Sequence, residues 1–89
     1  MFNSLKTLLA AGLIAVSAVA FAAPVDINQA DAQALATNLK GIGQSKAEAI
    51  VAYREAHGPF RAPEDLIMVK GIGHGILNKN RDLIQVSGQ

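Results

Sequence analysis

Two glycine-rich stretches of identical sequence contain the residues best suited to chemistry in this chain. Lys-Gly-Ile-Gly occupies positions 40–43 and recurs at positions 70–73, thirty residues later. Because glycine has no side chain, two glycines ahead of a helix leave backbone N–H groups uncovered, and an anion can approach them closely. The lysine that opens each stretch adds positive charge. The pattern therefore predicts two phosphate-binding turns.

The two glycines of each turn do not have the same explanation. A turn that reverses the chain between two helices needs a positive φ at some position, and glycine alone accepts it without steric penalty. This accounts for one glycine in each turn, but not for a second one at the same spacing in both copies. Ile42 and Ile72, which lie between the glycines, are expected to point inward and fix the turns to the core.

A lysine in the first turn of the following helix strengthens the phosphate interpretation. A cation there opposes the helix dipole, at a cost of about 0.3 to 1 kcal/mol at an exposed site. A bound phosphate would remove that mismatch at Lys46; the alternative is that Lys46 faces solvent and is partly compensated by Glu48. The predicted phosphate-binding residues are the turn glycines and the lysines near them: Lys40, Gly41, Gly43, Lys46, Lys70, Gly71, Gly73 and Lys79.

Helices are expected on both sides of the first turn. Apolar residues at helical spacing predict a helix over 29–39, with Asn28 as its N-cap. Ser45 and Glu48 have the spacing of a capping box, which places the start of the next helix directly after Ser45. That helix should end at 57–59, His-Gly-Pro, because glycine can adopt the left-handed C-cap conformation and proline cannot continue a helix.

The second turn has similar helical surroundings. Pro63 is a favoured first helical residue, and two acidic residues follow it at the positive end of the helix. Gly75 can open a final helix over 76–84. The chain then reads as helix, glycine turn, helix, twice over, with an internal repeat of thirty residues. We therefore predict an all-α fold, a small single domain of four to five short helices.

Residues 1–22 have the three-part pattern of a secretory signal peptide. Lys6 supplies the positive start, an uncharged apolar run follows over 8–19, and alanines at positions 20 and 22 are the small residues that a signal peptidase reads. We predict cleavage after Ala22, so that the domain comprises residues 23–89 and acts in the periplasm. The run is short for a membrane span, which needs about 20 mainly apolar residues, and a retained membrane anchor is the less favoured alternative.

Charge and composition narrow the range of functions. The chain has eight basic and seven acidic residues and a net charge of +1, and without Lys6 of the signal peptide the two signs balance. A general polyanion-binding surface is therefore not expected, and attraction to nucleic acid must come from the local arrangement of charges. The chain has no cysteine, which excludes thiol catalysis and disulfide bonds.

Catalysis is not expected either. A metal site needs several converging His, Cys or carboxylate ligands, and acid–base or nucleophilic chemistry needs at least two groups within reach of each other in a cleft. His57 and His74 stand alone in the sequence. The spacing of Ser45 is explained by capping and that of Glu64 by the start of a helix. We expect neither a cofactor nor an enzymatic activity.

An ordered series of motifs resembles a known family. In chain order the motifs are Val-Asp-Ile-Asn at 25–28, Leu-Lys-Gly-Ile-Gly at 39–43, Lys-Ala at 46–47, Tyr-Arg at 53–54, Gly-Pro-Phe at 58–60, Glu-Asp-Leu at 64–66 and Val-Lys-Gly-Ile-Gly at 69–73. Together they resemble the tandem helix-hairpin-helix domain of the ComEA competence protein family, in its short soluble periplasmic form. The resemblance covers residues 25–86.

The resemblance implies a function. Members of this family bind double-stranded DNA without reading its sequence, through its phosphates, and help to draw DNA across the envelope during natural transformation. The implied partners are therefore duplex DNA and the uptake machinery of the envelope, with self-association on DNA as a further expectation. A similar double-hairpin fold also serves in scaffolds, so the alternative is a protein–protein interaction module of the envelope with no nucleic-acid role.

Two positions depart from the family pattern. Lys40 stands where the family often has proline, which adds charge and loosens the turn. Asn80 stands where the first repeat has Ile50, on the inner face of the last helix. Because a buried amide must find hydrogen-bond partners, we expect Asn80 to brace nearby backbone rather than to bind DNA. The case for a phosphate site is therefore stronger at the first turn than at the second.

Overall fold

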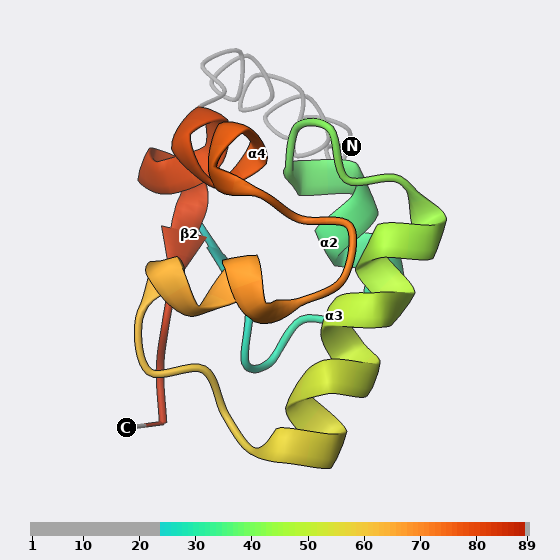
Figure 1. Ribbon diagram of the computed structural model, residues 1–89, viewed down its shortest axis with the longest axis vertical. Coiled ribbons are helices and arrows are strands. Elements are labelled where there is room, and N and C mark those ends of the chain that lie inside the picture. The colour runs from blue at the N-terminus through green and yellow to red at the C-terminus, as the bar shows by residue number, and fades with distance from the viewer. Residues whose placement is uncertain (1–23, 89) are drawn as a thin grey trace, which may run out of the picture.

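Helices account for most of the residues that the computed structural model describes, 24–88 (Figure 1). The elements in chain order are β1 (Val25–Asp26), α2 (Ala32–Asn38), α3 (Gln44–His57), the 3-10 helix η1 (Pro63–Met68), α4 (His74–Asn80), the 3-10 helix η2 (Arg81–Leu83) and β2 (Ile84–Gln85). The two Lys-Gly-Ile-Gly turns join α2 to α3 and η1 to α4, which confirms the all-α class and the repeated helix, turn, helix order. The predicted signal peptide lies outside the described residues.

A short parallel ladder joins the two ends of the described chain. Val25 pairs with Ile84, and Asp26 pairs with Gln85. The N–H of Ile27 adds a hydrogen bond of 3.0 Å to the carbonyl of Gln85. In Figure 1 this ladder is the place where the cyan start of the domain meets its red end. The last residues of the second repeat therefore close the domain against its first residues.

The last helix is shorter than predicted. A helix over 76–84 opened by Gly75 is wrong, because α4 begins at His74, directly after the second turn, and gives way to η2 after Asn80. Ile84 has an extended backbone with φ −103° and ψ 130°. Its pairing with β1 requires this conformation, so the ladder competes with continuation of the helix.

The first helix begins later than predicted. Asn28 as the N-cap of a helix over 29–39 is wrong, because α2 begins at Ala32. The cap is Asp31, whose Oδ1 accepts a hydrogen bond of 2.9 Å from the N–H of Ala34. The carboxylate thus occupies the positive end of the helix, where negative charge is stabilising.

The side chain of Asn28 is used elsewhere. Its Nδ2 donates to the carbonyls of Phe60 at 3.0 Å and Ser87 at 2.7 Å, and its Oδ1 accepts from the N–H of Phe60 at 2.8 Å. Arg54 acts in the same region, where its Nη1 donates to two carbonyls near the start of the domain at 2.8 and 2.7 Å. These bonds tie the start of the domain to the α3–η1 connection and to the C-terminal segment, and they explain why Asn28 does not cap α2.

The second helix begins two residues earlier than predicted. The Ser45–Glu48 capping box is wrong, because the N-cap is Gly43 and no side chain makes a capping hydrogen bond there. Glu48 instead accepts a hydrogen bond of 2.9 Å from Nε2 of Gln44. At the other end of α3, Gly58 adopts φ 96° at the C-cap, which confirms the predicted stop.

One apolar core lies beneath both glycine turns. Ile42 and Ile72 are each only 4% exposed, which confirms that the residue between the glycines points inward. Because the turns are fixed to the core in this way, their flanking glycines are held at the surface. The buried apolar residues are Val25, Ile27, Leu35, Leu39, Ile42, Ala47, Ile50, Phe60, Leu66, Val69, Ile72, Leu77 and Ile84.

Candidate nucleic-acid interface

The two glycines of each turn have different backbone conformations. Gly41 and Gly71, the first of each pair, have φ values of 75° and 95°. Gly43 and Gly73, the second of each pair, have φ values of −88° and −113°, which other residues adopt readily. The turn conformation therefore requires one glycine, as expected, and the structure shows that this is the first of each pair.

Packing does not require the second glycine either. A Cβ atom placed on Gly43 would have no heavy atom within 4 Å beyond its chain neighbours, and the same holds for Gly73. A side chain at either position would project into open space directly ahead of α3 or α4. The missing side chains thus keep the approach to both helix N-termini clear, and nothing in the fold of the described residues accounts for this.

The N-termini of α3 and α4 also lack negative charge. Whereas Asp31 caps α2, neither α3 nor α4 has a side-chain cap or an acidic residue in its first turn. The first N–H groups of an α-helix have no partner within the helix, and they form the positive end of its dipole. Helix α3, with 14 residues, therefore presents backbone donors and the positive end of its dipole beside Gly43, and Glu48, which accepts from the Gln44 side chain, lies beyond the first turn.

The structure places Lys46 against the second turn. A Cβ built on Gly71 would lie 3.7 Å from both Cγ and Cε of Lys46, so the aliphatic stem of that lysine covers Gly71. Conversely, a Cβ built on Gly41 would lie 3.8 Å from Cγ1 of Ile76, the residue thirty positions after Lys46. Each repeat covers the first glycine of the other repeat's turn. The two turns are therefore neighbours, and Lys46, which starts next to one of them, reaches the other.

The other predicted lysines divide between the two turns. Lys40 and Lys70 are exposed within their own turns. Lys79 is exposed in the last turn of α4, where a cation complements the negative end of the helix dipole. Because the neighbouring Asn80 contacts Lys40, this end of α4 lies beside the first turn rather than the second. The fold thus gathers lysines from both repeats around the pair of turns.

Asn80 braces the backbone of the first turn, as expected. It is 1% exposed, and its Oδ1 accepts a hydrogen bond of 2.7 Å from the N–H of Lys40. Its Nδ2 donates to the carbonyls of Lys40 at 2.8 Å and Ile76 at 2.9 Å. The amide of Asn80 therefore makes its hydrogen bonds inside the protein, which confirms that it braces backbone. That its partner would be the first turn was not apparent from sequence.

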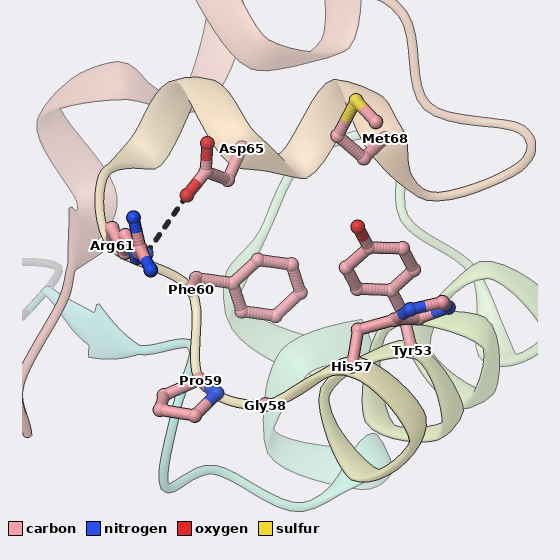
Figure 2. A pocket seen from close by; sticks show the side chains of 8 residues that line it. All are labelled: Tyr53, His57, Gly58, Pro59, Phe60, Arg61, Asp65 and Met68. Carbon is pink, nitrogen blue, oxygen red and sulfur yellow. Dashed lines mark hydrogen bonds between the residues drawn. The ribbon is translucent and has the colours of Figure 1, made fainter.

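A groove that sequence reasoning missed lies between α3 and η1 (Figure 2). It has a volume of about 350 Å³, and its lining includes Tyr53, His57, Phe60 and Met68. The ring of Tyr53 stacks on that of Phe60 with centroids 5.5 Å apart, and lies 4.2 Å from that of His57. Met68 is 63% exposed. None of the lining residues belongs to a glycine turn, so the groove is a separate surface.

Residues 24–88 contain neither a candidate metal site nor a candidate membrane-spanning helix. In this part of the chain, no three histidine, aspartate or glutamate side chains gather in a way that would hold a metal ion. No helix there is long and apolar enough to cross a membrane.

Comparison with known proteins agrees with this architecture. The sequence profile of the helix-hairpin-helix motif matches residues 21–85. An uncharacterized protein of Haemophilus influenzae is 53% identical over 60 residues, which are 67% of this chain and 54% of that protein. ComE operon protein 1 of Bacillus subtilis is 45% identical over 62 residues, 70% of this chain and 30% of that protein.

A third relative shows the same unit within a much larger protein. The endonuclease/exonuclease/phosphatase family domain-containing protein 1 of Xenopus laevis is 40% identical over 65 residues, 73% of this chain and 12% of that protein. The chain thus spans about half of the first relative and less than a third of the other two. Because the helix-hairpin-helix profile matches residues 21–85 and the structure has two glycine turns between helices, the chain belongs to the helix-hairpin-helix family, and the similarity to ComE operon protein 1 confirms its resemblance to the ComEA family.

Proposed function

We propose that this protein binds double-stranded DNA through its phosphates, without reading the base sequence. The observation that carries the proposal is the uncapped N-terminus of α3, kept open by a glycine at position 43 that neither backbone conformation nor packing requires. A phosphate oxygen at this position would accept hydrogen bonds from the first N–H groups of α3 and lie at the positive end of its dipole. The contacts we assign to DNA are those of Lys40, Gly41, Gly43, Lys46, Lys70, Gly71, Gly73 and Lys79.

The proposed process is DNA uptake across the envelope in natural transformation. The support is the ComEA-like motif series and the similarity to ComE operon protein 1. In this proposal the protein is exported, cleaved after Ala22, and acts in the periplasm with the envelope uptake machinery. It contributes binding and no catalysis, and it needs no cofactor.

Each copy of the protein is expected to bind DNA weakly. Few lysines surround the turns, and the domain without Lys6 is formally neutral, so each copy contacts few phosphates and binds weakly, with a strong dependence on salt. Retention of long DNA then requires many copies along one duplex, and contacts between copies would make their binding multivalent. Self-association on DNA would serve the same purpose.

The aromatic groove favours a second candidate function, a protein–protein interaction module. An exposed methionine beside stacked aromatic rings is the kind of surface at which apolar side chains of a partner dock. This function makes no use of the open helix N-terminus. The two candidates therefore differ in which surface must stay intact.

A binding assay with unrelated duplexes separates these candidates. Gly43→Asp places a carboxylate where the phosphate is proposed, while Gly43→Asn places a neutral side chain of the same shape there. Since both residues are good N-caps, both variants should remain folded. We expect Gly43→Asp to lose most of the DNA affinity and Gly43→Asn to lose less.

A matched pair of charge reversals controls for net charge. Lys46→Glu and Arg61→Glu change the charge equally, but Arg61 lines the groove. We expect Lys46→Glu to weaken DNA binding far more than Arg61→Glu, as measured by fluorescence anisotropy. If all these variants bind DNA as wild type does, the phosphate site at α3 is wrong, and if wild type does not bind DNA at all, the DNA function is wrong.

A further inference from the structure

We propose that Asn80 is a positioning residue for DNA binding at the first glycine turn, acting through the peptide groups of Lys40. The inference rests on the proposed DNA function. It assigns to the second repeat the task of holding the first repeat's phosphate-binding turn in its binding conformation.

The geometry of the Asn80 amide suits this task. Its Oδ1 and Nδ2 hold the N–H and the carbonyl of Lys40 at 2.7 and 2.8 Å, so two peptide groups of one residue are fixed by one side chain. A third bond of 2.9 Å to the carbonyl of Ile76 fixes the amide on its own helix. Because the side chain is 1% exposed, water does not compete for these bonds. The orientation of the Lys40 backbone is thus set from α4.

The two turns are held in different ways. The second turn is closed by its own backbone, since the N–H of Ile72 donates to the carbonyl of Val69 at 3.0 Å. The position equivalent to Asn80 in the first repeat is Ile50, which is buried and whose side chain has no polar atom. The clamp therefore acts on the first turn and has no counterpart at the second. This difference explains why an asparagine replaces an apolar residue in an otherwise repeated core.

The clamp acts on the part of the turn that faces DNA in the proposed function. Lys40 is exposed, and the next residue is the positive-φ glycine that aims the chain toward the N-terminus of α3. If the Lys40 peptides lose their partners, the lysine side chain and the amides after it sample several orientations. Phosphate binding must then supply the ordering that Asn80 supplies in the native protein.

The test is a double-mutant comparison of DNA affinity. Asn80→Ala is combined with Lys40→Gln at the first turn and, separately, with Lys70→Gln at the second turn. Asn28→Ala is the matched control, because Asn28 also makes three hydrogen bonds with its amide, all of them to residues outside the turns. Affinity is measured by fluorescence anisotropy with one duplex at fixed low salt and at a temperature at which circular dichroism shows each variant to be folded.

We expect Asn80→Ala to weaken DNA binding several-fold, because the backbone of Lys40 loses two hydrogen bonds. Asn28→Ala should leave the affinity within about twofold, because its partners lie outside the turns. In the double mutants, residues in contact are energetically coupled, whereas distant residues have additive effects. Lys40→Gln should have little further effect once Asn80 is replaced, whereas the effect of Lys70→Gln should be unchanged. A loss of stability alone would not produce this selective coupling to Lys40. Equal effects of the two asparagine variants, or additivity at Lys40, would overturn the inference while leaving the DNA function in place.

A second readout needs no DNA. Amide hydrogen exchange in the free protein should become faster over residues 40–46 in Asn80→Ala and remain unchanged over residues 70–76. If Asn80→Ala does not fold, Asn80→Ile, which restores the residue type of Ile50, is used in both measurements. Unchanged exchange at the first turn would overturn the inference, and failure of wild type to bind DNA would instead remove the proposed function on which it rests.

Discussion

At the scale of single residues, the second glycine of each turn is the most informative feature of the molecule. Gly43 and Gly73 occupy ordinary backbone conformations in open surroundings, so a side chain there would cost the fold little. Gly41 and Gly71 have positive φ and are needed for the turn itself. Two glycines separated by a single residue thus have different roles: the first is required by the backbone conformation, and the second keeps the surface ahead of the helix open.

Matched serine substitutions should expose this difference in stability. Gly71→Ser forces a side chain into the left-handed region, with φ 95°, and we expect it to lower the free energy of unfolding by about 1 to 2 kcal/mol. Gly73→Ser introduces a favourable N-cap residue at the start of α4, and we expect a change within about 0.5 kcal/mol of wild type. Urea denaturation measures both, and equal destabilisation would contradict the division of roles.

At the scale of elements, the ladder of β1 and β2 depends on a carboxylate. Oδ1 of Asp26 accepts hydrogen bonds from the N–H of Asn28 at 2.9 Å and from the N–H of Ser87 at 3.4 Å. Partial burial acts to raise the pKa of Asp26, but the hydrogen bonds from Ser87 and Asn28, with the charge of Arg54, outweigh it and lower the pKa below its ordinary value of 3.8. The native state therefore prefers the charged form.

This preference predicts an acid-dependent stability. The contribution of Asp26 is complete above the unfolded-state value near 3.8 and is lost as pH falls below it, through the lower native-state pKa. Asp26→Asn should therefore be less stable than wild type at pH 7, and the difference should shrink below pH 3.8. Thermal unfolding at several pH values measures it, and a difference that does not vary with pH would be contrary to this account.

At the scale of the whole molecule, the two repeats form one unit. Lys46 covers Gly71, Ile76 covers Gly41, and Asn80 holds Lys40. Neither turn is complete without the other repeat. In the proposed DNA function this arrangement is important, because the domain without Lys6 is formally neutral, so that attraction to DNA would come from lysines gathered at one place and not from the total charge.

The salt dependence of DNA binding tests this arrangement. We expect the logarithm of the binding constant to fall linearly with the logarithm of salt concentration, with a slope of about −0.9 for each phosphate neutralised. Lys46→Gln should reduce the magnitude of the slope by about one unit. Two duplexes of unrelated sequence should give the same slope and affinity, as measured by anisotropy titrations at several salt concentrations. An affinity that does not change with salt would contradict binding through phosphates.

Much of the architecture could be predicted from sequence because it depends on local chemistry. A positive-φ glycine in each turn, the stop at Gly58 and the start at Pro63 follow from what glycine and proline allow a backbone to do. The inward direction of the isoleucine in each turn follows from its apolar side chain. These features need only neighbouring residues, and the repeated motif marks the turns at which the DNA contacts are proposed.

The tertiary structure decided the features that depend on distant partners. Asn28 is a good N-cap by type, but it binds Phe60 and Ser87, the second of which lies 59 residues away. The backbone that Asn80 holds lies 40 residues away. A side chain that satisfies several distant hydrogen-bonding groups gains more than a local cap provides, and only the folded chain brings those groups together. By itself, the sequence thus determined where the glycine turns are, and the tertiary structure determined that each is completed by the opposite repeat.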